Sequence, residues 1–448
     1  MKGFLTSCVV ALAALAPSHA HAQSSGAERH AVQTSLLRIH GSNTIGEHLA
    51  PALIAAWTRS RGIALTGPAG DAAGEREWQA GALRIRLQAH GSNVGMNDLL
   101  GGRADVAMSS RAATTAEIAA AAAAGLGRLD DPAQEFVVAL DGLAIIVHPD
   151  NPLVSLDRRT LQRIFAGELR QWGALGGHDG PVRLLARDDR SGTYDTFRSL
   201  VLGDAQLHPS ARRFESTDEL AAEVARDRHA IGFVGLAGVG RARALSIHEA
   251  DTWPLPPDAE SVAVEDYLLT RRLYVYLRAD ASPLARSFAA FAVGDAAQPV
   301  IERAGFVGQT IRMIARRPDA QAPAAYRQLV GDASRLSINF RFGTGAAVLD
   351  TRAVRDIERL AAFLRQPDYA EATVALLGFA DASETLPYLA ITLANDRVDY
   401  LAAQLTARGV PVAVARGIGG IMPVASDETD RGRRKNRRVE VWVRPSGR

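Results

Sequence analysis

The sequence predicts an α/β fold of two or three compact units, and three observations support this prediction. Short apolar runs alternate with helical stretches over residues 36–309, a pattern typical of α/β folds with largely parallel sheets. Residues 316–334 are rich in Ala, Gln and Pro and predict a linker. A shorter unit with its own alternation follows. The length of 448 residues leaves room for two or three domains.

Residues 1–22 predict a cleaved signal peptide. Lys2 precedes an apolar run over residues 8–16, and Ala20 and Ala22 give the small-x-small pattern of a signal peptidase site. The run is well short of the ~20 residues that span a bilayer. The single cysteine, Cys8, leaves with this peptide, so disulfides and thiolate metal sites are not expected in the exported chain. Residues 23–35 predict a polar, mobile leader.

The first unit contains six expected strands and five expected helices, in alternation. The strands are expected at 37–40, 85–90, 106–109, 136–148, 182–187 and 231–234. The helices are expected at 45–59, 116–124, 161–166, 193–201 and 218–226. In α/β folds of this kind, ligands bind where strands end and helices begin.

The second unit predicts a small β-α-β-α-β-β domain. Strands are expected at 336–340, 373–378, 412–416 and 437–443, and amphipathic helices at 350–364 and 388–407. The full division is therefore a signal peptide (1–22), a leader (23–35), a first domain (36–313), a linker (314–335) and a second domain (336–448).

Four junctions between a strand and a helix carry Gly, Ser or Thr and together predict an anion site. They lie at 40–46, 91–95, 109–111 and 187–193. Hydroxyls and backbone N–H groups at helix starts suit an anion, and Arg187 adds a guanidinium fork that Asp189 is expected to hold. Each junction alone is more often an ordinary helix cap, so the prediction depends on finding four in one domain.

These motifs, in this order, resemble the periplasmic phosphate-binding proteins of the PstS type. The resemblance rests on Gly-Ser-Asn-Thr at 41–44, Gly-Ser-Asn-Val-Gly at 91–95, the 104–111 stretch, Arg187 and Ser-Gly-Thr at 191–193, and it covers residues 36–309. It implies a two-lobed clamshell that closes on phosphate about a hinge near 136–146 and 267–277 and delivers it to an ABC transporter permease. The phosphate-binding residues it implies are Thr44, Ser92, Ser110, Arg187, Ser191, Gly192 and Thr193.

One position departs from that family. Some members carry an aspartate where this chain has Ser110, and that aspartate accepts the proton of hydrogen phosphate. A serine hydroxyl can donate or accept. The sequence therefore permits phosphate and leaves sulfate and other tetrahedral oxyanions open.

The second unit resembles OmpA-like peptidoglycan-binding domains over residues 336–444. Residues 377–381, 393–398, 418–424 and 432–441 carry the resemblance. It implies that Asp381 and Arg397 bind the ammonium and carboxylate of diaminopimelate. The family's usual asparagine and serine are replaced by Ala390 and Ala394, and the loop after Asp381 lacks the expected glycine and is one residue longer.

Other function classes find little support in the sequence. The run 431–438 holds six basic residues in eight, but no aromatic residues interleave and acidic residues precede it, so nucleic acid is not expected as a partner. The 51 Lys and Arg nearly balance the 49 Asp and Glu. No nucleophile elbow, phosphate loop or zinc helix is present, so we expect no enzyme, no cofactor and no metal.

The sequence thus predicts a periplasmic protein, associated with the cell wall or outer membrane, that captures phosphate for uptake and is tethered to peptidoglycan. The alternative is a wall-associated sensor or structural protein whose clamshell no longer serves transport, because a tethered donor must still reach the inner membrane.

Overall fold

The computed structural model describes residues 35–69, 74–189, 191–314, 322–343, 348–369, 371–384 and 386–444. The predicted signal peptide and residues 23–34 of the predicted leader lie outside these ranges. Ser35, the last residue of that leader, begins the first strand.

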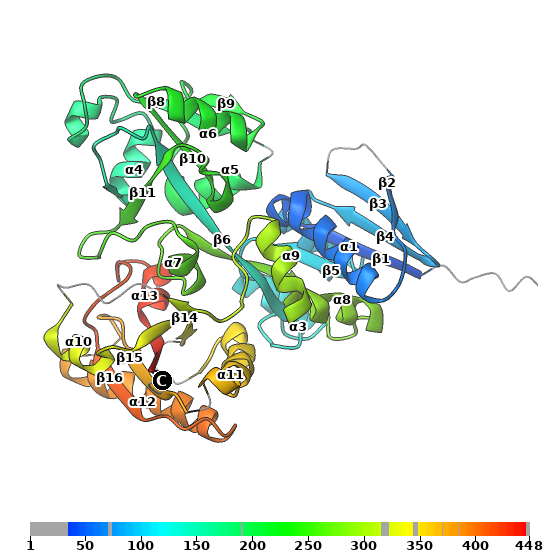
Figure 1. Cartoon of the computed structure of the whole chain (residues 1–448). Helices are drawn as coiled ribbons and strands as arrows, with labels where there is room; N and C mark the ends of the chain where they lie inside the picture. Colours follow the sequence, from blue (N-terminus) through cyan, green and yellow to red (C-terminus); the bar gives the residue numbers. More distant parts are fainter. Residues whose placement is uncertain are drawn as a thin grey trace, which may run out of the picture.

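Two lobes share one mixed sheet (Figure 1). Lobe 1 comprises residues 35–139 and 271–309, and lobe 2 comprises residues 140–270, each with its own apolar core. The strand order is β2-β3-β4-β1-β5-β12-β6-β10-β8-β9; β11 also pairs with β6, and β7 pairs with β11. The α/β prediction is confirmed, but the sheet is less parallel than expected. The chain leaves lobe 1 on β6 and returns on β12, which therefore pair antiparallel.

The strand β6 (Glu135–Val147) connects the lobes. Its first half pairs with β12 (Thr270–Tyr276), and its second half pairs with β10 and β11 of lobe 2. Both strands coincide with the segments in which the sequence placed a hinge.

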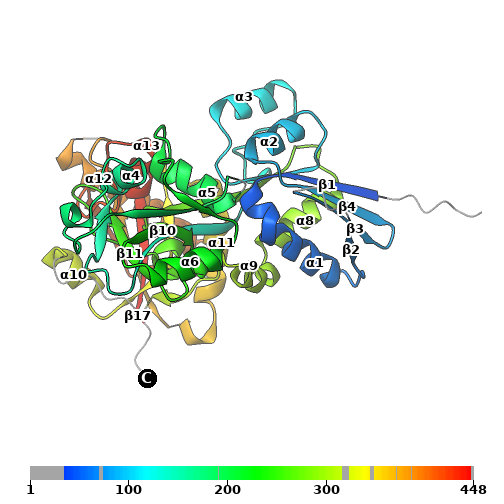
Figure 2. The same cartoon turned by 90° about the horizontal axis from the view of Figure 1, so that it is seen from above.

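Lobe 1 encloses its part of the sheet between helices. Figure 2 shows α1 and α8 on one face and α2 and α3 on the other. Trp57 of α1 meets Phe288 of α8 edge to face, with ring centroids 5.5 Å apart. The elements are β1 (Ser35–Gly41), the π-helical turn η1 (Ile45–Leu49), α1 (Ala50–Ser60), β2 (Thr66–Ala69), β3 (Glu75–Ala80), β4 (Leu83–Gln88), α2 (Ser92–Leu100), β5 (Val106–Ser109), α3 (Thr115–Ala123), α8 (Pro283–Val293), η5 (Asp295–Ala297) and α9 (Gln298–Arg303).

Lobe 2 also alternates strands with helices along the chain. Phe165, Phe197 and Phe233 form an aromatic centre, in which the last two rings stack with centroids 3.9 Å apart. The elements are β7 (Ser155–Asp157), α4 (Arg158–Phe165), η2 (Trp172–Leu175), β8 (Arg183–Arg187), α5 (Gly192–Phe197), η3 (Arg198–Leu202), β9 (Arg212–Phe214), α6 (Thr217–Arg226), β10 (Ala230–Gly235), η4 (Leu236–Gly238), β11 (Arg243–His248) and α7 (Ala259–Ala263).

The C-terminal domain is built on a separate five-stranded sheet of order β13-β14-β17-β15-β16. The predicted β-α-β-α-β-β order holds from β14 to β17, with one extra helix, α13, before the last strand. The elements are β13 (Met313–Ile314), α10 (Ala324–Val330), β14 (Ser334–Arg341), α11 (Thr351–Leu364), η6 (Pro367–Tyr369), β15 (Thr373–Phe379), α12 (Pro387–Thr406), β16 (Val414–Gly419), α13 (Asp430–Asn436) and β17 (Arg438–Arg444).

The segment expected to be a linker contains the helix α10. Tyr326 on this helix is buried, its hydroxyl donates to the Glu440 carboxylate at 2.7 Å, and its ring meets Trp442 edge to face. This segment therefore covers one face of the C-terminal sheet. Residues 315–321 of the expected linker lie outside the described residues.

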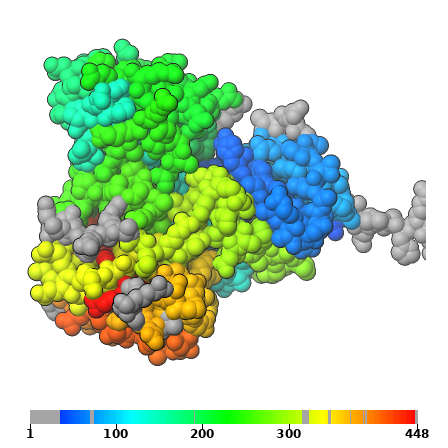
Figure 3. Space-filling model, viewed as in Figure 1, coloured from blue at the N-terminus to red at the C-terminus, as the bar shows by residue number. Residues whose placement is uncertain are grey.

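The C-terminal domain contacts both lobes, as the space-filling view shows (Figure 3). On lobe 1, Arg355 of α11 donates to the Glu135 carbonyl at 2.9 Å, and Arg359 donates to the Gln309 side chain at 2.8 Å. On lobe 2, Asp266 forms buried ion pairs with two arginines of β14, Arg335 and Arg341. The domain thus bridges the two lobes beside the strands that connect them.

Among the described helices, none combines the length and the apolar character needed to cross a membrane.

Candidate functional site

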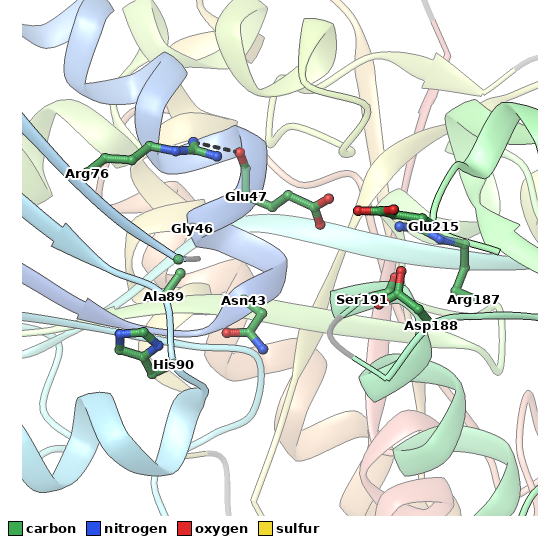
Figure 4. A pocket seen from close by; sticks show the side chains of 11 residues that line it. Asn43, Gly46, Glu47, Arg76, Ala89, His90, Arg187, Asp188, Ser191 and Glu215 are labelled. Atoms are coloured by element: carbon green, nitrogen blue, oxygen red, sulfur yellow. Dashed lines mark hydrogen bonds between the residues drawn. The ribbon is translucent and has the colours of Figure 1, made fainter. Parts of the chain in front are cut away.

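A cavity of about 430 Å³ lies between the lobes, which we call the cleft cavity (Figure 4). Its lobe 1 wall comes from η1 and the residues before it, the start of β3 and the loop after β4. Its lobe 2 wall comes from the ends of β8 and β9 and the residue before α5. Its lining residues are Asn43, Gly46, Glu47, Gly74, Arg76, Ala89, His90, Arg187, Asp188, Ser191 and Glu215.

Of the residues that the sequence analysis assigned to phosphate, Arg187 and Ser191 line the lobe 2 wall, together with Asp188 and Glu215. Arg187 ends β8 and is 6% exposed. Its Nε donates to the Phe214 carbonyl at 3.3 Å, and its Nη1 donates to the Thr217 hydroxyl. Ser191 caps α5 by accepting a hydrogen bond from the Thr193 backbone N–H at 3.2 Å.

The expected support of Arg187 by Asp189 is wrong. The Asp189 carboxylate is largely exposed and pairs with Arg213 on β9. The guanidinium of Arg187 is oriented instead by the end of β9 and the start of α6. These groups are remote in sequence, so the local spacing could not reveal them.

Thr44, Gly192 and Arg271 join the lobes beside the cleft cavity. The Thr44 hydroxyl donates to the Gly192 carbonyl at 3.2 Å and accepts from Nη2 of Arg271 at 2.6 Å. Arg271 also donates to the same carbonyl at 3.0 Å and to Asp141 at 3.0 Å. Thr44 and Gly192, which the sequence assigned to opposite walls, therefore contact each other directly.

Ser92 and Ser110 lie together in lobe 1. Their hydroxyl oxygens are 3.2 Å apart, and the Ser110 backbone N–H donates to the Ser92 hydroxyl at 3.0 Å. Neither lines the cleft cavity, and neither do Thr44, Gly192 and Thr193. Arg111, beside this pair, is held by Glu117 at 2.7 Å and by Asn93 at 2.6 Å.

The cleft cavity carries charges of both signs. Arg76 and Arg187 line it together with the carboxylates Glu47, Asp188 and Glu215. The pKa of Glu47 is lowered chiefly by its hydrogen bond to His48, with further contributions from Arg187 and Arg76. The cavity can therefore offer an anion both hydrogen-bond donors and carboxylate oxygens that accept a hydrogen bond from a protonated oxyanion.

The sequence analysis did not identify these carboxylates as site residues. It also did not identify His90 or Arg271. Glu47 and Glu215 lie in ordinary helical and loop sequence with no motif. Arg271 had a visible signal, because a charged residue in an apolar strand is rarely buried without a partner. In the structure that partner is Asp141 of β6, at 3.0 Å.

In the C-terminal domain, Asp381 and Arg397 are both buried and both paired. The Asp381 carboxylate accepts from Arg437 at 2.9 Å and from the Ser383 hydroxyl at 2.7 Å. The Arg397 guanidinium pairs with Glu384, in the loop after β15, and both side chains are at most 1% exposed. Asp381 follows β15 and Arg397 lies on α12, and each already pairs with an opposite charge.

The basic run 431–438 is partly internal. Lys435, Arg437 and Arg438 are buried, and Arg438 lies over the Phe379 ring and pairs with Glu440. Arg437 and Arg438 therefore stabilise the domain from within, whereas Lys435 contacts lobe 2. The described residues also contain no group of three His, Cys, Asp or Glu side chains placed to hold a metal ion.

Comparisons with known proteins agree with this architecture. Residues 37–296 match the PBP superfamily domain, and residues 341–437 match the OmpA family. The phosphate-binding protein PstS of Borreliella burgdorferi is 25% identical over 233 residues, which cover 50% of this chain and 80% of that protein. The probable lipoprotein YiaD of Escherichia coli is 29% identical over 109 residues, which cover 24% of this chain and 48% of that protein.

A solved structure shares the fold of the two lobes. It is a possible phosphate-binding protein from Planctomyces limnophilus, 21% identical, with a TM-score of 0.50 over 61% of this chain and 93% of that one. The chain therefore belongs to the PBP superfamily and carries an OmpA family domain after its two lobes.

Proposed function

We propose that the two lobes capture inorganic phosphate, or a similar tetrahedral oxyanion, in the cleft cavity. The observation that supports this most directly is Arg187, a buried guanidinium that lines a cavity shared by both lobes. Its planar fork suits an oxyanion. Several relatives named as phosphate-binding proteins are similar over this part of the chain.

Binding would require the lobes to close about β6 and β12. Arg187 and Ser191 would hold the anion from lobe 2, with Gly192 and Thr193 beside them, and Thr44, Ser92 and Ser110 would approach from lobe 1. Asp188, adjacent to Arg187 in the wall, offers a carboxylate that could accept the proton of hydrogen phosphate where Ser110 replaces the family's aspartate. No covalent step is involved, so the chain acts as a binding protein and not as an enzyme.

Calorimetric titration of the full chain tests this proposal. The wild type should bind phosphate, and Arg187→Ala combined with Thr193→Ala should weaken binding at least 100-fold, since a charge-assisted contact and a hydroxyl donor are both lost. Arg159→Ala, at an exposed position of lobe 2, is the matched control. Unchanged affinity in the double variant would refute the site. Titration with sulfate and arsenate at two pH values shows which oxyanion is preferred.

We propose further that the C-terminal domain binds peptidoglycan through the diaminopimelate group, with Asp381 and Arg397 as contacts. On this proposal the chain acts in the periplasm, at the cell wall or outer membrane. Retention on purified peptidoglycan tests the contact. Arg397→Lys keeps the charge but loses the planar fork, and should be retained several-fold less than wild type. Equal retention would contradict the assignment of Arg397.

Two roles follow for captured phosphate. Delivery to an ABC transporter permease is the first. The second is a wall-associated sensor, which is favoured by the bridging of both lobes by the C-terminal domain, because closure of the lobes would act on that domain. Phosphate uptake by cells lacking the chain separates the roles: slower uptake under phosphate limitation supports delivery, and normal uptake supports the sensor.

A further inference from the structure

A second cavity, of about 170 Å³, lies between lobe 2 and the C-terminal domain. We call it the interdomain cavity. Its polar lining comes from both sides, with Arg158, Ser199 and Glu249 from lobe 2 and Thr429, Arg431 and Lys435 from the C-terminal domain. It shares no lining residue with the cleft cavity.

The lining carries three cations and one carboxylate. Glu249 is fully used, because one oxygen accepts from Arg158 at 2.6 Å and the other accepts from the Ser426 backbone N–H at 2.7 Å. It therefore balances Arg158 and leaves the charges of Arg431 and Lys435 without a carboxylate in the cavity.

Arg431 and Lys435 are held by carbonyl groups. Nη2 of Arg431 donates to the Thr270 carbonyl at 2.8 Å, and Nζ of Lys435 donates to the Tyr267 carbonyl at 2.8 Å and to the Glu265 carbonyl. These contacts satisfy N–H groups but do not cancel the charges. Burial, and then Arg431 and Arg341, lower the pKa of Lys435 to about 7. Burial, and then Arg158, lower the pKa of Arg431 to about 10.

The neighbouring acids do not remove this excess. Glu265 pairs with Arg272 and Arg352, and Asp266 pairs with Arg335 and Arg341. Each of these carboxylates thus already faces two guanidinium groups. Lys435 is buried and Arg431 is partly buried. A buried cation without a matching anion is unfavourable, and an anion entering the cavity would relieve it.

We propose that the interdomain cavity is a second anion site, which takes a small oxyanion and is complete only while the C-terminal domain is docked on lobe 2. Arg431, and Lys435 in its protonated form, would supply the charge, and the Ser199 and Thr429 hydroxyls would supply neutral donors. At about 30 Å³ per water, the cavity has room for about five to six waters, and so for the five heavy atoms of phosphate. The same chemistry would accept the carboxylate of a wall peptide.

The test uses the full chain with the cleft silenced by Arg187→Ala and Thr193→Ala. Inorganic phosphate and acetate are titrated separately by calorimetry at pH 7. One equivalent of at least one anion should still bind, and adding Arg431→Gln should weaken it at least tenfold. Arg434→Gln, at an exposed position of the same helix, should change affinity by twofold or less. Preference for phosphate would indicate a free ion, and preference for acetate would indicate a peptide carboxylate.

A silenced chain that binds neither anion would overturn the proposal, as would equal affinity with and without Arg431→Gln. Lys435→Met is a second variant that should still fold, because it replaces a buried cation by an apolar side chain of similar length. It should leave the circular dichroism spectrum unchanged and weaken anion binding. The stoichiometry of binding separates the two sites. If the wild type binds two equivalents and the silenced chain binds one, both sites are supported. If each binds one equivalent and Arg431→Gln abolishes it, only the interdomain cavity is supported.

Discussion

At the scale of single residues, the ion pair between Arg397 and Glu384 determines how the C-terminal domain can bind a ligand. Both side chains are buried, so in the proposed contact with peptidoglycan the Glu384 carboxylate would occupy the position that the ligand carboxylate needs. A ligand must therefore displace Glu384 before it can meet the guanidinium.

Glu384→Gln should strengthen retention on purified peptidoglycan several-fold. The amide removes the competing charge and leaves the Arg397 fork for the ligand. Glu428→Gln, an exposed carboxylate in another loop of the same domain, is the control and should behave as wild type. Weaker retention of Glu384→Gln would show that Glu384 supports the site and does not block it.

Single residues also show which parts of the site can be predicted from the sequence. Arg187 and Ser191 line the cleft cavity, as their motif indicates. The partners of Arg187 come instead from β9 and α6, and the partner of Thr44 comes from β12. A motif identifies groups that are close in the chain, whereas the groups that orient them are brought together only by the fold.

At the scale of elements, the start of α5 rests directly on lobe 1. A Cβ at Gly192 would lie 2.4 Å from the Cα of Thr44 and 2.5 Å from its hydroxyl oxygen. Only a glycine permits this approach, so the contact between the lobes depends on the absence of a side chain there.

Gly192→Ala should therefore force the lobes apart at this point and weaken phosphate binding at least tenfold, with little change in lobe 2 itself. Calorimetry measures the affinity, and small-angle scattering measures the radius of gyration, which should rise. Gly235→Ala is a matched control at the end of β10, because a Cβ there meets nothing within 4 Å. If Gly192→Ala and Gly235→Ala bind equally well, the contact has no role in binding.

Most helices and strands could be predicted because their apolar residues recur with a clear period. Elements without this apolar pattern were not predicted. β5 lies at the residues expected for it, and α11 begins after Asp350, its N-cap. The strand β2 was missed because Thr-Gly-Pro-Ala has no apolar alternation and is exposed along its length. The helix α13 was missed because its seven residues include five charged side chains and no apolar one.

At the scale of the whole molecule, docking of the C-terminal domain was not predictable from sequence. It depends on acids of lobe 2 that meet arginines of β14 and α11, about 70–90 residues away in the chain. Asp266 shows the strength of this arrangement. Burial alone would raise its pKa, but Arg335 and Arg341 outweigh burial and lower the pKa to about 2.

The contribution of Asp266 to stability should therefore be fully present above about pH 4 and be lost as the pH falls towards 2, since the folded state binds its proton less readily than the unfolded state. Asp266→Asn should remove this part of the acid dependence. At pH 7 it should cost about 3–5 kcal/mol, because two buried arginines lose their shared partner. Denaturant unfolding followed across this pH range provides the measurement.

Asp105→Asn is the control for that experiment, because Asp105 pairs with Arg38 at a partly exposed position within lobe 1. Its effect should stay near 1 kcal/mol or below. If Asp266→Asn and Asp105→Asn cost the same, the ion pairs between lobe 2 and the C-terminal domain do not hold the two together.

Two successive residues of β12 face in opposite directions. Arg271 donates to Thr44 and Gly192 between the lobes, whereas Arg272 pairs with Glu265 and with Asp350 of the C-terminal domain. The pleat of a strand sends neighbouring side chains to opposite faces. The same short stretch of β12 therefore contacts both the junction of the two lobes and the docked C-terminal domain. Thermodynamic linkage makes the effects of docking and of anion binding equal. If docking of the C-terminal domain changes the free energy of anion binding, a bound anion must change the free energy of docking by the same amount.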